Sequence, residues 1–238
     1  MTHSTDAGNR AIPPDQRLSR QQRSDEAGVD DIAAGFSRRR LWRRWFQLVT
    51  VGESLGFLAP AAAGAVIADR GGLPAATALL VAGAVEGATL GWFQARALQP
   101  ALPGLPSRRW VAATISGAVV AWSVGALFVL TDGMSGWTSL PQLGTFVAGG
   151  LVILLSIGVA QWVVLRGYVR GAVRWIAATA AAWLAGLTAF AAFTTPLWQP
   201  GQSPALVAVI GVFGGLLMAA AMAAVSGLLL VRLLGKSR

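Results

Sequence analysis

The sequence has no cysteine, a single histidine and little charge for its length. The lack of cysteine excludes disulfides, thiolate nucleophiles and iron–sulfur or cysteine-type zinc sites. The one histidine, His3, lies in a polar N-terminal segment, which excludes a Ser-His-Asp triad and histidine-based metal or haem sites in the body of the chain. Charged residues are 12% of 238, about half of the ~25% that is usual in a soluble domain.

Motifs that would carry chemistry are also missing from the sequence. It contains no phosphate-binding P-loop, no HExxH zinc motif and no Gly-x-Ser-x-Gly nucleophile motif. Tyr168 and the scattered serines have no activating partner nearby in the sequence. We therefore expect a protein that is not an enzyme and that binds no metal and no cofactor.

The N-terminal segment, residues 1–37, differs from the rest of the chain. Its four arginines and six acidic residues give it a net charge of −2, and it has almost no aliphatic periodicity. Such a segment buries too little apolar surface to offset the entropy of ordering, so we expect a disordered cytoplasmic tail. It lacks the basic and then apolar regions of a secretory signal peptide.

The body of the chain, residues 38–238, is built from long apolar runs separated by short polar breaks. A helix needs about 20 residues to cross the ~30 Å hydrocarbon core, and runs of this length are not typical of soluble helices. Abundant Ala, Leu and Gly without strand-like alternation favour helices over an outer-membrane barrel. The sequence predicts an all-α membrane protein. Its six predicted spans are 45–68, 73–97, 110–130, 142–165, 174–194 and 205–231.

The basic residues of the body lie on one side of these spans. Fourteen of the fifteen flank the first span's start, the 2–3 and 4–5 connections or the C-terminus, and only Arg70 lies in the other connections. The positive-inside rule then predicts cytoplasmic termini in a bacterial inner membrane. Spread along one face without a reading motif, these residues do not indicate nucleic-acid binding, and anionic lipid headgroups are the expected partners. Tryptophans near the same ends are predicted to form an interfacial belt. They are Trp42, Trp45, Trp110, Trp162 and Trp175.

Three copies of a two-span hairpin recur in the sequence, over about 45–97, 110–165 and 174–231. Trp45, Trp110 and Trp175 open the odd-numbered spans at intervals of 65 residues. A proline opens each even-numbered span, where its missing N–H is harmless. Gln94 and Gln161 follow two of these prolines by twenty residues each. Because each hairpin starts and ends on the same side, we expect a parallel repeat arranged around a pseudo-three-fold axis.

The motif strings of this repeat resemble those of a group of uncharacterised bacterial multi-pass membrane proteins. In that group G-x-x-Q-W-x-x-L and a following W-V-x-A-T are repeated. The closest string here is Gly158-Val-Ala-Gln-Trp-Val-Val-Leu165, and the best-covered part is spans 2–5. The resemblance implies a bacterial polytopic membrane protein and brings no activity with it.

Two acidic residues, Glu53 and Glu86, lie within the predicted spans. An ionisable group in hydrocarbon normally faces protein or water, because exposing it to lipid costs ~2.5–3.5 kcal/mol. At 1.5 Å per residue, Glu53 lies ~12 Å beyond Trp45, and Glu86 ~16 Å from the end of its span on the same side. The two carboxyls are therefore expected at similar depth, where two buried neighbours do not readily both ionise.

Small and amide-bearing residues complete the candidate intramembrane site. Gln94 and Gln161 are expected to form interhelical hydrogen bonds, or alternatively to line a pore entrance. Glycines at GxxxG spacing predict close helix packing. They are Gly52, Gly56, Gly83, Gly87, Gly91, Gly211 and Gly215.

Two functions of different classes remain open from the sequence. The first is a structural or accessory membrane component, either a homo-oligomer or the partner of another membrane protein, in which Glu53 and Glu86 only join helices. The alternative is a small proton or cation channel or transporter that uses these two carboxyls. The first is favoured, because two buried acids and no predicted break within a span are sparse for a transporter.

Overall fold

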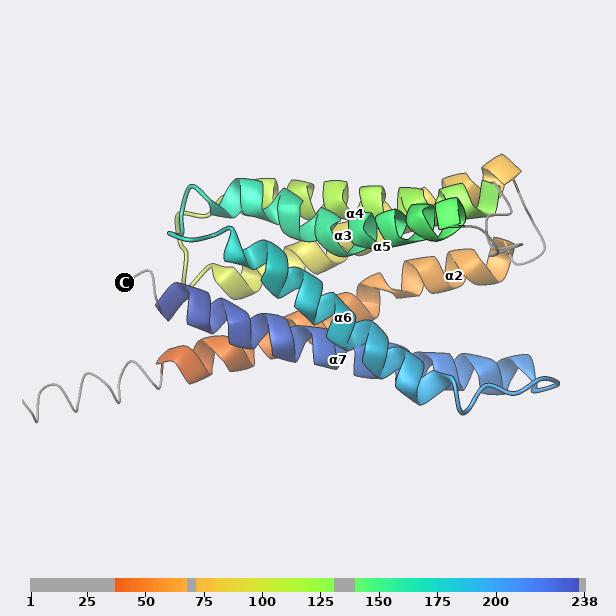
Figure 1. Ribbon diagram of the computed structural model, residues 1–238. Helices are drawn as coiled ribbons and strands as arrows, with labels where there is room; N and C mark the ends of the chain where they lie inside the picture. Colours follow the sequence, from red (N-terminus) through yellow and green to blue (C-terminus); the bar gives the residue numbers. More distant parts are fainter. Residues whose placement is uncertain (1–36, 68–71, 131–139, 236–238) are drawn as a thin grey trace, which may run out of the picture. The chain divides into compact units, whose positions relative to one another are not determined.

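The computed structural model describes residues 37–67, 72–130 and 140–235 (Figure 1). The chain divides into two units, Met1–Arg40 and Leu41–Arg238. In the first unit only residues 37–40 are described, and they are helical, so the predicted tail lies outside the described residues up to residue 36. Apart from these four residues, all that follows concerns the second unit.

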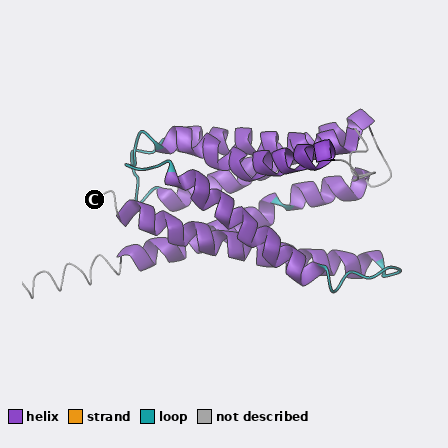
Figure 2. Cartoon of the chain, in the orientation of Figure 1, coloured by secondary structure: helices purple, strands orange, loops and turns teal. Residues whose placement is uncertain are grey.

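Every regular element in the described ranges is a helix, and none of them contains a strand (Figure 2). A helix over residues 37–56 is followed by six further helices. These are α2 (Leu58–Ile67), α3 (Gly72–Leu98), α4 (Ser107–Leu130), α5 (Leu140–Leu165), α6 (Arg174–Thr194) and α7 (Pro204–Gly235).

Six of the described helical segments are long and apolar enough to cross a membrane. The 37–56 helix and most of α2 together form the first, Ser37–Ala65, and α3 to α7 supply the other five. This confirms the predicted all-α protein with six candidate spans. The observed bounds differ from the predicted ones mainly at the start, where the arginine-rich residues before Trp45 extend the first helix.

The first span is interrupted at Phe57, which the sequence analysis did not predict. Phe57 is a turn residue between the 37–56 helix and α2. Pro60, three residues later, has no N–H to donate to the carbonyl of Gly56, and its ring crowds that carbonyl. The backbone N–H groups of Phe57 and Ala61 still bond the carbonyls four residues earlier, at 2.8 and 3.1 Å. The expectation of unbroken spans is therefore wrong for this span, one turn after Glu53.

The helices pack in the order of the sequence. Among α2 to α7, the backbone of each helix lies beside that of the next one along the chain (Figure 1). The 37–56 helix contacts α3, where Gly52 lies against Phe93, and also α7, where the Trp45 ring lies against Gly227. The first and last helices of the unit are therefore neighbours.

The most extensive apolar core lies at the end of the unit where the arginines gather. Its largest members are Trp45, Trp110 and Trp175, together with Leu98 and Leu165, all of them 0–1% exposed. The connections 99–106 and 166–173 contribute buried side chains to the same cluster. Towards the opposite end α5, α6 and α7 expose many of their apolar side chains, as helices facing lipid do.

Candidate functional site

Glu53 lies where the 37–56 helix approaches α3 most closely. A Cβ atom at Gly52 would lie 2.6 Å from Cβ of Phe93, and one at Gly56 would lie 3.2 Å from the carbonyl oxygen of Glu86. Glycines at these two positions therefore let the helix backbones approach. Glu53, between them, has no exposed surface.

Glu86 on α3 is held by a tryptophan of the next helix. The indole Nε1 of Trp122 on α4 donates a hydrogen bond of 2.7 Å to Oε2 of Glu86, which is 5% exposed. Gly83, one turn before Glu86, makes room for the Trp122 ring, which a Cβ atom there would strike. Glu86 thus connects α3 to α4.

The two carboxyl groups form a pair in which only one is supplied with a donor. They lie close enough to interact with each other. Among the described residues, no N–H or hydroxyl donates to either oxygen of Glu53. A hydrogen bond between two carboxyl groups needs a proton on one of them. A shared proton would therefore give Glu53 a hydrogen bond without any further residue.

Gln94 and Gln161, which come from α3 and α5, are brought together inside the protein. Nε2 of Gln161 donates to Oε1 of Gln94 at 2.7 Å and to Oγ1 of Thr114 on α4 at 3.0 Å. Both glutamines and Thr114 are 0–4% exposed. These bonds join three helices through groups that would be costly to bury unpaired.

Three buried tryptophans each donate an indole N–H to a polar side chain of another helix. The pairs are Trp110 with Gln94 at 3.2 Å, Trp175 with Gln161 at 2.8 Å and Trp45 with Ser226 at 2.9 Å. We call these pairs, with Thr114, the Trp–Gln network. Ser226 on α7 passes a hydrogen bond of 2.8 Å to the carbonyl of Met222.

The predicted interfacial role is wrong for these three tryptophans. They are 0–1% exposed, and the ring of Trp175 lies 5.7 Å from that of Trp45 and 6.2 Å from that of Trp110. Buried polar partners satisfy their N–H groups, so the rings do not need headgroups or water. Trp42 and Trp162, from the same predicted belt, are only half-buried.

The glycines singled out by the sequence fall into two groups. Those on the first span and α3 lie at close helix contacts; at Gly87 and Gly91, for example, a Cβ would come within 2.8–2.9 Å of side-chain atoms of α4. Gly211 and Gly215 on α7 have looser surroundings, at 3.7–3.8 Å from aromatic rings. Close contacts also occur at glycines that were not singled out as packing residues. They are Gly117, Gly158, Gly186, Gly214 and Gly227.

Several partners of the predicted polar residues were not predicted from the sequence. Thr114, which accepts a hydrogen bond from Gln161, follows Trp110 by four residues, as Thr179 follows Trp175, so the repeat offered a signal for Thr114. Ser226 gave no such signal, because alanine stands at the glutamine position of the third copy. The bond from Trp122 to Glu86 had no counterpart elsewhere in the repeat.

The side chains of this site can exchange protons and form hydrogen bonds. In the described ranges no three His, Cys, Asp or Glu side chains lie close enough to hold a metal ion. The Glu53 and Glu86 carboxyls are the two groups there that can exchange a proton within the membrane.

The chain matches no protein-family model, no curated protein and no solved structure.

Proposed function

We propose that this protein is a structural or accessory component of a bacterial cytoplasmic membrane and has no enzymatic activity. The observation that carries the proposal is the Trp–Gln network, in which buried polar groups are paired with those of neighbouring helices. In a membrane such bonds, with close glycine contacts, hold helices together without a hydrophobic driving force. Residues used in this way are not free to bind a substrate.

The architecture that we propose is three hairpins around a pseudo-three-fold axis. The tryptophan that opens the second hairpin donates to the first, and that of the third donates to the second. The tryptophan of the first hairpin donates to Ser226 in the third, which closes the cycle. The equal spacing of 65 residues between Trp45, Trp110 and Trp175 supports the same arrangement.

We place both termini in the cytoplasm. The supporting observation is that arginines near the ends of different helices come together: Nη2 of Arg44 donates to the carbonyl of Arg96 at 2.9 Å, and Arg174 and Arg232 line one pocket. The chain has no cysteine, so single cysteines can report sidedness. A membrane-impermeant maleimide should label Gln199→Cys in intact spheroplasts and Arg170→Cys only after permeabilisation. The reverse pattern would overturn the orientation.

An accessory role implies a stable protein partner, which is either another membrane protein or a second copy. The chain purified from its native membrane in mild detergent should therefore run as a homo-oligomer or carry one membrane protein at fixed stoichiometry. Mass measurement by light scattering and protein identification by mass spectrometry test this expectation. A monomer that carries lipid alone would contradict the accessory role.

A second candidate function is proton or cation conduction through Glu53 and Glu86. It is favoured by one observation, that the fully buried carboxyl of Glu53 receives no hydrogen bond from a donor of the described residues. Acidic groups retained within membrane spans often mark ion or proton pathways. The interruption at Phe57, one turn away, adds the kind of irregular backbone that lines ion sites in transporters.

Flux measurements separate the two functions. The full chain is reconstituted into liposomes that carry a proton, Na⁺ or K⁺ gradient, beside protein-free liposomes. The structural proposal expects equal leakage in both, and no change in Glu53→Gln or Glu86→Gln. Flux in the wild type that both variants lose would overturn that proposal and establish conduction through the pair.

A further inference from the structure

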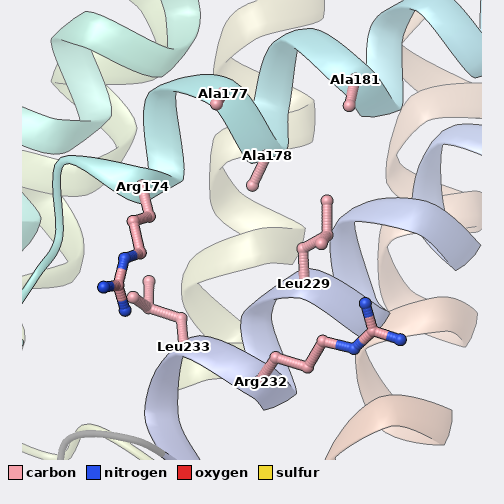
Figure 3. A pocket seen from close by; sticks show the side chains of 7 residues that line it. All are labelled: Arg174, Ala177, Ala178, Ala181, Leu229, Arg232 and Leu233. Carbon is pink, nitrogen blue, oxygen red and sulfur yellow. The ribbon is translucent and has the colours of Figure 1, made fainter.

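A pocket of about 410 Å³ lies between α6 and α7 at the end of the unit where the arginines gather (Figure 3). Its volume falls within the range of sites that hold small ligands. Its lining comes from two helices. On one side are four residues of α6, namely Arg174, Ala177, Ala178 and Ala181, and on the other are three of α7, namely Leu229, Arg232 and Leu233. The structure thus forms a groove that neither helix fills with its own side chains.

The walls of this groove are apolar along the axis of α6. The three alanines of α6 are too small to reach α7, where the leucines form the opposite wall (Figure 3). From Arg174 to Ala181 the helix rises about 10 Å, at 1.5 Å per residue. The groove therefore extends from the helix ends into the hydrocarbon region and suits part of an acyl chain.

Two arginines line the groove, one from each helix, and Figure 3 shows their guanidinium groups apart from each other. Arg174 is the first residue of α6, and Arg232 lies in the last turn of α7. Both are exposed, and neither makes an ion pair or a side-chain hydrogen bond with the described residues. The acidic side chains of the described residues, Glu53 and Glu86, lie on the first span and α3, and both are buried.

The position of Arg174 adds a second indication of an anionic ligand. A cation in the first turn of a helix is disfavoured by the helix dipole, and the first turn of α6 has no acidic residue to offset it. A bound anion would reverse this unfavourable interaction. Guanidinium groups also match the geometry of phosphate oxygens, with which they form paired hydrogen bonds.

We propose that the α6–α7 groove binds one anionic phospholipid, with its headgroup bound by the side chains of Arg174 and Arg232 and an acyl chain along the alanines. Charge complementarity selects an anionic lipid over a zwitterionic one, and the apolar walls select a lipid over free phosphate. This site is more specific than the general attraction of anionic headgroups to a basic membrane face. It does not depend on the proposed structural role.

The test is native mass spectrometry of the delipidated full chain in detergent, titrated with phosphatidylglycerol or phosphatidylcholine. We expect one phosphatidylglycerol to bind at least tenfold more tightly than phosphatidylcholine. The double variant Arg174→Gln, Arg232→Gln should lose roughly ten- to thirty-fold in affinity for phosphatidylglycerol. The double variant Arg108→Gln, Arg109→Gln removes the same charge from the start of α4 and should bind as the wild type does.

Two further arms identify the occupant. Ala181→Phe fills the groove without touching a charge and should weaken both lipids, whereas millimolar inorganic phosphate should not compete. Equal loss in the two arginine variants, no lipid preference, or competition by phosphate would each overturn the proposal. A change in oligomeric state caused by Ala181→Phe, without an effect on lipid, would assign the groove to a contact between copies of the chain and overturn it as well.

Discussion

Single tryptophan side chains carry hydrogen bonds that join helices in this protein. Trp175 donates to Gln161 at 2.8 Å from a position that is 1% exposed, so neither water nor lipid headgroups can replace the bond. Removing one partner from a buried pair leaves the other unsatisfied, which costs more than the bond itself contributes. The N–H of a tryptophan at the surface should contribute little to the stability of the fold.

This difference can be measured with two identical substitutions. Trp175→Phe keeps an aromatic ring but removes the N–H, so the free energy of unfolding should fall by about 1–3 kcal/mol. Trp92→Phe on α3 is the control, because Trp92 is 48% exposed. SDS titration of the protein in mixed micelles gives both values, and equal losses would mean that the bond to Gln161 does not stabilise the fold.

The sequence predicted these residues better than it predicted their surroundings. The recurrence of tryptophan every 65 residues marked Trp45, Trp110 and Trp175 as equivalent, and glutamine within a span indicated interhelical bonding. Their burial was missed because a tryptophan near a helix end looks the same whether its partner is a headgroup or Gln161. Only the packing of the neighbouring helices distinguishes these two environments.

At the scale of the helix, close approach depends on which face of each helix carries glycine. On α4, a Cβ atom at Gly117 would lie 2.5 Å from Cα of Ile157 on α5, while one at Gly125 would meet nothing within 4 Å. The first position leaves no space for a methyl group against backbone. The second offers open space on the same helix.

Alanine substitution should therefore have opposite effects at these two positions. Gly117→Ala forces α4 and α5 apart and should lower the free energy of unfolding by roughly 1–3 kcal/mol. Gly125→Ala should raise it by about 0.5–1 kcal/mol, because alanine loses less backbone freedom in a helix. The same SDS titration measures both, and a stabilised Gly117→Ala variant would contradict the close α4–α5 contact.

The spans themselves were predictable, because their length and apolar composition are set by the bilayer. The interruption at Phe57 was less so, since Pro60 was read as part of a continuous run although it removes a hydrogen-bond donor from the helix interior. GxxxG spacing likewise indicates that a helix can approach a neighbour, but not which neighbour. Gly211 and Gly215 have this spacing and no close partner, whereas Gly117 has a partner without having been singled out.

At the scale of the whole helical unit, the contact between the first and last helices supports the proposed arrangement. Nε1 of Trp42 donates to the carbonyl of Ala224 at 3.3 Å, and Trp45 bonds Ser226 on the same helix. Two sequential rows of helices would leave these residues apart. A cycle of three hairpins requires them to be neighbours.

Chemical cross-linking of the cysteine-free chain tests this closure directly. With cysteines at Trp42→Cys and Ala224→Cys, a short bis-maleimide should join the first helix to α7 within one molecule, detected by mass spectrometry of the digested monomer band. Arg109→Cys with Arg232→Cys is the control pair. Both residues lie at the end of the unit where the arginines gather, but α4 and α7 do not pack against each other. Trp42 and Ala224 are half-buried whereas Arg109 and Arg232 are exposed. A higher yield from the first pair therefore cannot result from better reagent access and reports proximity. Equal yields would place α7 away from the first helix, and the three-hairpin cycle would have to be abandoned even if each span crosses the membrane as proposed.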